Sequence, residues 1–414
     1  MKHVVVIGGG VIGLATALEC ARRGHRVSIV ERDAVRRGAS LGNAGMIVPS
    51  HFIPLAAPGM VALGLKWMWN PESPFYIQPR WSWDLLTWGL RFWQASTPQR
   101  VERAAPLLRD LQLASRAAFE CLAAEADDFG LVRRGLLVLC KTASALEEEA
   151  HTAGRARRLE IPAEVLDAGQ TAALEPGITM DIAGAVYYER DCHLDPGRFV
   201  AALEKRLRAA GVRLLDDAAV TGWVREGARI AAVRTTRGEI AGDEFVLAGG
   251  AWSSELVREL GLRLPMQAGK GYSVTLPEPV ERPGICAILA EARVAVTPMG
   301  RALRFGGTME LAGMDETINP RRVAGIVRAA HEYFPRFEAA QFAGVKPWSG
   351  LRPCSPDGLP YLGRTRAAGN LVVATGHAMM GLSLALVTGE IVGAIVDGEP
   401  GRFDLGLLGV DRFG

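Results

Sequence analysis

The chain has 414 residues, of which 49% are hydrophobic and 22% charged, and 47 Lys and Arg nearly balance 45 Asp and Glu for a formal charge of +2. This composition excludes a disordered chain and a coiled coil, and the balanced charge argues against a nucleic-acid partner. At about 100–200 residues per domain, the length predicts two or three domains. The 48 glycines exceed the usual share of about 7%.

Six cysteines are scattered along the chain without a Cys-x-x-Cys pair. We therefore expect no metal site, no disulfide framework and a reducing, cytoplasmic location. Met1 leads directly into a β-branched run without the pattern of a signal peptide, and no apolar run reaches the about 18 residues that cross a bilayer. We expect a soluble protein, and peripheral association with the inner face of the cytoplasmic membrane stays open.

The chain begins with a strand–turn–helix pattern. Residues 4–7 predict a buried parallel strand, and Gly8, Gly10 and Gly13 follow it at the start of a helix that Gly24 ends. Residues 25–30 predict a second strand that closes on Glu31. In this context the G-x-G-x-x-G spacing predicts a dinucleotide-binding turn.

Each position of this turn has a physical task. Gly8 allows the tight turn, Gly10 lets the backbone approach a pyrophosphate, and Gly13 permits close packing of helix on strand. Glu31 is expected to accept hydrogen bonds from ribose hydroxyls, and its charge disfavours NADP. The turn alone leaves the choice between FAD and NAD open.

The loop that follows favours FAD. Residues 36–46 form a small-residue loop where a nicotinamide enzyme would continue into another βα unit, and the segment Asn43-Ala44-Gly45 resembles the family of FAD-dependent amine oxidoreductases that includes D-amino acid oxidases, glycine and sarcosine oxidases and D-amino acid dehydrogenases. Together with Ala57-Pro58-Gly59, it looks most like the dehydrogenase branch.

The resemblance continues along the chain and implies the fold. Residues 189–196 and the amphipathic stretch 197–210 resemble the segment that re-enters the FAD domain, residues 214–246 predict a β-meander, and residues 245–253 match a strand-to-turn segment near the cofactor. We expect an α/β protein with a Rossmann-like FAD-binding domain and a second, α+β substrate domain on a mostly antiparallel sheet. The expected division assigns 1–60, 145–260 and 340–414 to the FAD domain, and 61–144 and 261–339 to the substrate domain.

The C-terminal part carries the main substrate candidate. Residues 346–363 are dense in turn formers and predict a loop, and within them the resemblance implies that Arg352 binds the substrate carboxylate. The alternative is an arginine that pairs with a structural acid. Residues 370–375 predict a strand, and Gly376 to Ser383 is expected to start a helix, running to about Val396, whose N-terminus faces the flavin.

Three further side chains have two interpretations each. His377 is interpreted as a packing or cofactor contact and not as a catalytic base. Tyr272, in the predicted crossing 262–274 into the substrate domain, reaches either the substrate or the protein core. Lys270 resembles a lysine that helps some oxidase relatives react with oxygen, but it does not decide the acceptor.

Six tryptophans lie within 27 residues and predict either a helix-packing region, which we favour, or an interfacial patch; they are Trp67, Trp69, Trp81, Trp83, Trp88 and Trp93. Cys354 lies near the position where a relative attaches FAD covalently, but non-covalent FAD is expected. The resemblance assigns the FAD contacts to Gly8, Gly10, Val11, Ile12, Gly13, Glu31, Arg32, Ser40, Asn43, Ala44, Gly45, Met46, Val220, Ala248, Gly249, Trp252, Gly350, Arg352, Gly376, His377, Met379, Met380, Gly381 and Leu382.

The sequence therefore predicts an FAD-dependent D-amino acid dehydrogenase, with D-proline or D-hydroxyproline as a plausible substrate class and a quinone-type electron acceptor. Flavin carries the hard chemistry, so the protein needs only to bind and place the amino acid. A glycine or sarcosine oxidase that uses oxygen, and a non-catalytic FAD-binding subunit of an amine dehydrogenase complex, are the alternatives. The oligomeric state stays open.

Overall fold

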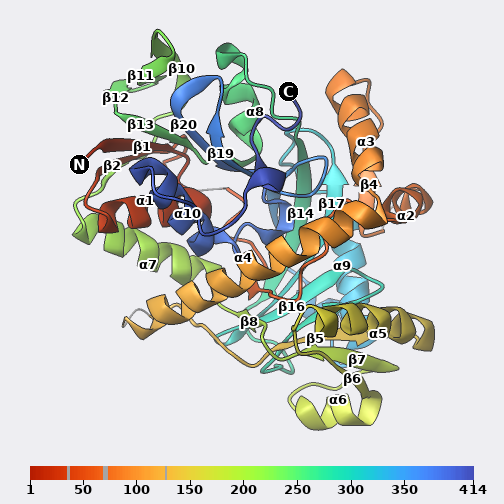
Figure 1. Ribbon diagram of the computed structural model, residues 1–414. Helices are drawn as coiled ribbons and strands as arrows, with labels where there is room; N and C mark the ends of the chain where they lie inside the picture. Colours follow the sequence, from red (N-terminus) through yellow and green to blue (C-terminus); the bar gives the residue numbers. More distant parts are fainter. Residues whose placement is uncertain (35–37, 69–72, 126–127) are drawn as a thin grey trace.

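Two large sheets organise the computed structural model, which describes residues 1–34, 38–68, 73–125 and 128–414 (Figure 1). Residues 36 and 37 of the expected cofactor loop, and Trp69, lie outside the described residues. No helix in the described ranges has the length and apolar character to cross a membrane.

The first sheet has six strands in the order β19-β20-β13-β1-β2-β9, with all neighbours parallel except β19. Its strands are β1 (His3–Ile7), β2 (Arg26–Val30), β9 (Arg213–Leu215), β13 (Glu244–Leu247), β19 (Tyr361–Thr365) and β20 (Ala368–Thr375). Parallel strands buried on both faces read as continuous apolar runs, as β1 and β13 do here. The predicted Rossmann-like sheet is confirmed.

Different layers cover the two faces of this sheet. Val4 and Val6 of β1 share a core with the helices α1 (Val11–Arg22), α4 (Pro98–Ala124), α7 (Pro196–Ala209) and α10 (Ala385–Asp397). Val5 and Ile7 point to the other face. That face packs on the predicted meander, formed by β10 (Val220–Glu226), β11 (Arg229–Thr235) and β12 (Gly238–Ala241).

The second sheet has nine strands in the order β18-β14-β17-β16-β15-β5-β7-β6, with β4 beside β17, and it is mostly antiparallel, as predicted. Its strands are β4 (Phe75–Ile77), β5 (Leu136–Cys140), β6 (Glu164–Asp167), β7 (Gly184–Tyr188), β14 (Gln267–Leu276), β15 (Cys286–Leu289), β16 (Val294–Met299), β17 (Ala302–Leu311) and β18 (Trp348–Cys354). A small ribbon pairs β3 (Met46–Ile47) with β8 (Cys192–His193).

Helices surround this second sheet. The helix α9 (Pro320–Tyr333) packs its apolar side on one face. The remaining helices are α2 (Met60–Trp67), α3 (Trp83–Ala95), α5 (Ala143–Arg158), α6 (Ala168–Leu174) and α8 (Ser253–Leu256). In Figure 1, α2 and α3 stand at one side of the molecule and α5 and α6 at its lower end.

Two segments differ from the expected division of the chain. Residues 145–188 were assigned to the FAD domain, but their strands β6 and β7 pair with β5 in the nine-stranded sheet. Conversely, α4 packs in the core of the six-stranded sheet. An apolar strand or an amphipathic helix fits either core by pattern alone, and only the tertiary pairing decides.

Candidate active site

The Gly-rich turn has the predicted geometry. Gly8 has φ +110°, and a Cβ there would lie 2.4 Å from the Ala248 carbonyl oxygen. A Cβ on Gly13 would lie 1.9 Å from the Gly8 carbonyl oxygen, so only glycine allows this approach of α1 to β1. Gly10 caps α1 without a side chain, which leaves the helix start open to a phosphate, and the Val11 N–H donates to Ser40 Oγ at 3.1 Å.

Glu31 follows β2 at the edge of the same turn. Its carboxylate accepts hydrogen bonds from the Gly9 N–H at 2.6 Å and the Asp33 N–H at 3.1 Å. The neighbouring Arg32 guanidinium lies 4.2 Å from the centre of the Trp252 ring. Both Glu31 and Arg32 border the cavity described next.

A cavity of about 1120 Å³ runs from this turn to the nine-stranded sheet. It exceeds the roughly 300–1,000 Å³ of ordinary small-molecule sites, as a dinucleotide together with a substrate requires. Three expected cofactor residues, Gly13, Gly45 and Gly376, are not among its lining residues. The expected residues that line it are Gly8, Gly10, Val11, Ile12, Glu31, Arg32, Ser40, Asn43, Ala44, Met46, Val220, Ala248, Gly249, Trp252, Gly350, Arg352, His377, Met379, Met380, Gly381 and Leu382.

One face of the nine-stranded sheet forms the wall of the cavity opposite the turn. Directly paired residues project from the same face, and the register aligns Ile288 with Ala295 and Ala295 with Gly306 on the cavity side. Gly271 and Gly350 face each other on the same side of β14 and β18. Ala295 and Gly306 keep this part of the wall low, whereas the Arg352 guanidinium lies over Gly271 and the Trp348 ring over Gly350.

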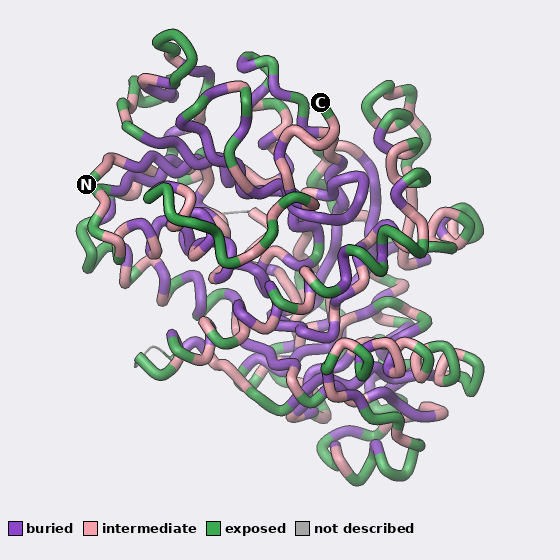
Figure 2. Tube along the Cα trace, in the orientation of Figure 1, coloured by how far each residue is buried: buried purple, intermediate pink, exposed green. Residues whose placement is uncertain are grey.

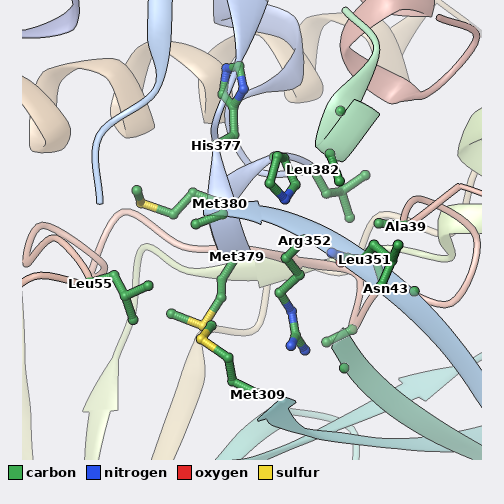
Figure 3. Close-up of a pocket in the computed structure, with 18 of the residues that line it drawn as sticks. Ala39, Asn43, Leu55, Met309, Leu351, Arg352, His377, Met379, Met380 and Leu382 are labelled. Carbon is green, nitrogen blue, oxygen red and sulfur yellow. The ribbon is translucent and has the colours of Figure 1, made fainter. Parts of the chain in front are cut away.

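Arg352 lies on β18, an edge strand, where a loop was expected. An edge strand tolerates the adjacent Pro353, whose missing N–H costs no ladder hydrogen bond on the open side. The Arg352 side chain points into the cavity in Figure 3, and its Nη1 donates to the Thr308 carbonyl oxygen at 2.7 Å. None of the ion pairs among the described residues includes Arg352, and burial lowers its pKa. The alternative of a structural acid is therefore not supported.

Two neighbouring residues, Gly271 and Thr308, hold the Arg352 side chain in position. A Cβ on Gly271 would lie 2.3 Å from the guanidinium carbon, so the guanidinium lies against a bare stretch of backbone. Thr308 has φ +68°, which is rare for a β-branched residue, and it lies where the pairing of β14 with β17 shifts register. The bulge turns the Thr308 carbonyl toward Arg352, and no sequence pattern predicts it.

Tyr272 and Lys270 point to the opposite face of the sheet. The Tyr272 hydroxyl donates to Glu310, and its ring packs in the core beside α9. Lys270 Nζ donates to Asp315 Oδ2 at 2.7 Å and to the Thr317 carbonyl oxygen at 2.9 Å. The Tyr272 side chain thus packs in the core, although the residue also borders the cavity, and the ammonium of Lys270 is turned away from the cavity.

The segment after β20 is not the start of a long helix. A 3-10 turn spans Ala378–Met380, and α10 begins only at Ala385, because Gly376 and Ala378 have φ of +79° and +48°. His377 points away from Arg352 in Figure 3, its Nε2 lies 3.1 Å from Thr388 Oγ1, and burial lowers its pKa to about 3. The expectation of a packing residue agrees with this geometry.

Cys354 follows Arg352 on β18 but belongs to a different environment. Its thiol packs in an apolar cluster with Trp88 and Met309, and burial raises its pKa to about 11. A buried, protonated thiol is a poor nucleophile. This favours the expected non-covalent FAD.

The sequence did not point to two groups of cavity residues. Met309 and Met379 lie beside Arg352 in Figure 3, with Leu55 beyond them, and neither Met309 nor Leu55 carries a sequence signal for a substrate wall. His51 lines the cavity as well, with Nδ1 3.3 Å from Ser50 Oγ, and burial lowers its pKa to about 4. Behind it, the Ser50 hydroxyl and N–H donate to buried Asp191, whose pKa burial raises to about 7.

A dinucleotide turn that shares one cavity with a buried arginine is typical of a dinucleotide-dependent oxidoreductase. The profile of the family described as FAD dependent oxidoreductase matches residues 3–395. The D-amino acid dehydrogenase of Paramagnetospirillum magneticum is 34% identical, with 99% of this chain and 98% of that protein aligned, and that of Cereibacter sphaeroides is 33% identical over 99% and 95%. The crystal structure of glycine oxidase from Geobacillus kaustophilus has a TM-score of 0.80 at 27% identity, with all of both chains covered.

The chain belongs to the FAD-dependent oxidoreductase family, and its cofactor is FAD. The residues present fit that group. The open start of α1 and the glycines at 8 and 10 provide the pyrophosphate site, Glu31 lies where a ribose would follow, and the cavity continues past the small residues Ala295 and Gly306 of the nine-stranded sheet.

Proposed function

We propose that this protein is a D-amino acid dehydrogenase that passes electrons to a quinone-type acceptor. The observation that carries the proposal is Arg352, a guanidinium inside the cavity whose described hydrogen bond goes to a backbone carbonyl. Full-length similarity to relatives named D-amino acid dehydrogenase supports the substrate class.

Arg352 binds the substrate carboxylate in this proposal. The hydrogen bond of Nη1 to Thr308 fixes the plane of the guanidinium, and the remaining N–H groups face the cavity. A fixed planar fork binds a carboxylate through two parallel hydrogen bonds, and the low dielectric of the cavity strengthens them. The carboxylate anchor thereby positions the α-carbon.

FAD, when bound, supplies the two-electron acceptor for a hydride from the substrate α-carbon. The amine must lose its proton first, and the apolar wall formed by Met309, Met379 and Leu55 disfavours the charged ammonium form. The His51 imidazole of the same cavity is too weak a base to take this proton, because burial lowers its pKa to about 4, and the proton therefore leaves to solvent. The imine that results is hydrolysed by water unless its nitrogen belongs to a ring.

The surroundings of Arg352 also bear on side-chain preference. Met309, Met379 and Leu55 offer a flexible apolar wall and no charged partner for a substrate side chain (Figure 3). We therefore place D-proline or D-hydroxyproline among the preferred substrates. A cyclic substrate would yield a pyrroline carboxylate as product.

A panel of substrates tests this function. The FAD-loaded protein is mixed under anaerobic conditions with D-proline, D-alanine, L-proline, glycine and sarcosine, and the loss of flavin absorbance is followed. Rapid bleaching by D-amino acids is expected. Failure of every amine to bleach the flavin would instead favour a non-catalytic FAD-binding subunit.

The second candidate function is a glycine or sarcosine oxidase, which the match to glycine oxidase favours. Lys270, the lysine that resembles the oxygen-activating one, points away from the cavity, and this supports the dehydrogenase. The acceptor is tested with reduced enzyme. Stoichiometric hydrogen peroxide without quinone reduction would establish the oxidase.

A further inference from the structure

The helix α3 carries two apolar stripes on opposite sides. One stripe faces the protein, where Trp88 is buried and Phe92 packs beside it. The other consists of Trp83, Leu86, Leu90 and Trp93, and their spacing of three, four and three residues places them along one line of an α-helix. These four residues are named here the outer stripe.

The outer stripe has no partner within the described chain. Trp83 is 85% exposed, Trp93 62%, and Leu86 and Leu90 more than half. Trp81, just before the helix, is 99% exposed. The expectation that the tryptophans pack in the interior therefore fails for three of them, and Figures 1 and 2 show α3 standing out from the body of the molecule with exposed segments along its length.

We propose that the outer stripe docks on a lipid bilayer surface that contains anionic phospholipid. An exposed apolar patch of this kind marks a contact surface, and Trp with Leu on one face of a helix suits the headgroup boundary. The charges nearby agree. Between residues 60 and 100 the sequence has four basic residues, Lys66, Arg80, Arg91 and Arg100, against the two acidic residues Glu72 and Asp84, and Asp84 pairs with Arg258 at 3.3 Å.

The position of the docking surface connects it to the active site. The inner sides of α2 and α3 line the large cavity through Met60, Gly64, Trp88 and Phe92. A molecule dissolved in the bilayer would therefore meet the cavity between two apolar helices. That consequence rests on the proposed quinone acceptor, whereas docking itself does not.

Vesicle binding of the FAD-loaded protein tests the proposal. The stripe variant carries Trp83→Gln, Leu86→Gln, Leu90→Gln and Trp93→Gln, because glutamine keeps helix propensity and the positions are exposed. The matched control replaces exposed apolar residues elsewhere, Val165→Gln, Val280→Gln and Ile318→Gln. Vesicles are made of phosphatidylcholine alone or with phosphatidylglycerol.

Wild type and the control variant are expected to sediment with the anionic vesicles, more weakly at high salt, and the stripe variant to bind at least about tenfold more weakly. Equal binding by the stripe variant, or no binding by wild type, would overturn the proposal. So would a wild-type dimer that becomes a monomer in the stripe variant, because the stripe would then join two copies of this chain.

Activity separates this inference from the proposed function. With a water-soluble dye as acceptor, both variants are expected to oxidise D-amino acids at the wild-type rate. If wild type itself does not oxidise D-amino acids, the proposed function is contradicted, and the vesicle-binding result is unaffected. With a quinone embedded in vesicles as the acceptor, only the stripe variant is expected to oxidise D-amino acids more slowly than wild type.

Discussion

Arg352 occupies a position where its charge has few partners within the protein. Replacement by leucine removes the carboxylate anchor, and the loss of a desolvated ionic contact is expected to cost about 2–5 kcal/mol of transition-state binding. We expect Arg352→Leu to raise KM for amino acids sharply while FAD stays bound. Steady-state kinetics and the flavin content of the variant measure both effects. An unchanged KM would show that Arg352 does not bind the substrate carboxylate.

Gly271 sets the height of that guanidinium above the sheet. A methyl group there would lie 2.3 Å from the guanidinium carbon, so Gly271→Ala must displace the Arg352 side chain. We expect a higher KM with FAD retained, as for Arg352→Leu but smaller. Gly369→Ala, at a strand position of β20 with open space around its Cβ and no positive φ, is the control for backbone effects. Normal kinetics in Gly271→Ala would contradict the described contact.

Asp191 makes stability depend on pH. Burial raises its pKa from the ordinary 3.8 to about 7, so the folded state binds the proton more tightly than the unfolded chain. Burial therefore costs nothing below about pH 4, and the penalty grows to on the order of 4 kcal/mol as pH rises through 7.

Asp191→Asn should remove this dependence, since an amide oxygen still accepts a hydrogen bond from Ser50. Chemical denaturation at pH 5 and pH 8 measures it. The variant is expected to gain stability relative to wild type at both values, by roughly 2–3 kcal/mol more at pH 8 than at pH 5. An equal difference at both values would show that Asp191 does not titrate as described.

Among the structural elements, the turn between β1 and α1 is the part of the site that the sequence predicts most clearly. Glu31→Ala removes a carboxylate that a ribose would contact, and hydrogen bonds to charged groups are worth about 1.5–3 kcal/mol. We expect roughly ten- to hundredfold weaker FAD retention, measured as flavin per protein after gel filtration. Glu239→Ala, on the exposed strand β12, is the control, and full flavin content in Glu31→Ala would contradict the ribose role.

Local patterns predicted the elements whose geometry is local. The spacing of Gly8, Gly10 and Gly13 was enough to predict the turn. Each of these glycines is required by a close contact with residues nearby in sequence or with the adjacent strand. The residues 346–363 were expected to form a loop because of Gly and Pro. The structure shows β18 there, since its partner β14 lies about 80 residues away and no local pattern contains that pairing.

The same limit applies to the neighbours of Arg352. The arginine was predicted through a family resemblance, but Thr308 and Gly271 were not, because their role depends on a register shift between β14 and β17. The helix expected at Gly376 begins at Ala385 for a related reason. Positive φ at Gly376 and Ala378 ends the regular backbone there, and Ala378 carries no sequence signal for it.

At the scale of the whole molecule, two sheets meet around one cavity. The six-stranded sheet presents the dinucleotide turn, and the nine-stranded sheet presents a wall of small residues with Arg352 at its edge strand. Segments far apart in sequence are needed for both, since the first sheet uses β1 and β20 and the second uses β5 and β18. Some of the glycines serve this cavity, among them Gly8 and Gly10 at the cofactor turn and Gly271 beneath Arg352, and many others lie in turns elsewhere.

In the proposed function the nine-stranded sheet binds the substrate and the six-stranded sheet binds the cofactor. We therefore predict that separate substitutions weaken substrate binding and cofactor binding. Arg352→Leu should lose the first and Glu31→Ala the second, although the two side chains border one cavity. A double variant is expected to show additive losses, because the residues lie on different sheets and share no described hydrogen-bond partner. Strong non-additivity in a double-mutant cycle would contradict this separation.

The central claim is that Arg352 and FAD act together on D-amino acids. It is tested most directly by anaerobic mixing of the FAD-loaded protein with a D-amino acid and with its L-enantiomer, followed by addition of quinone or air. The account predicts that the D-enantiomer bleaches the flavin, that Arg352→Leu slows this at least about thirtyfold at limiting substrate, and that quinone restores the colour faster than air. Bleaching by the L-enantiomer alone, or no bleaching by any amino acid, would contradict it.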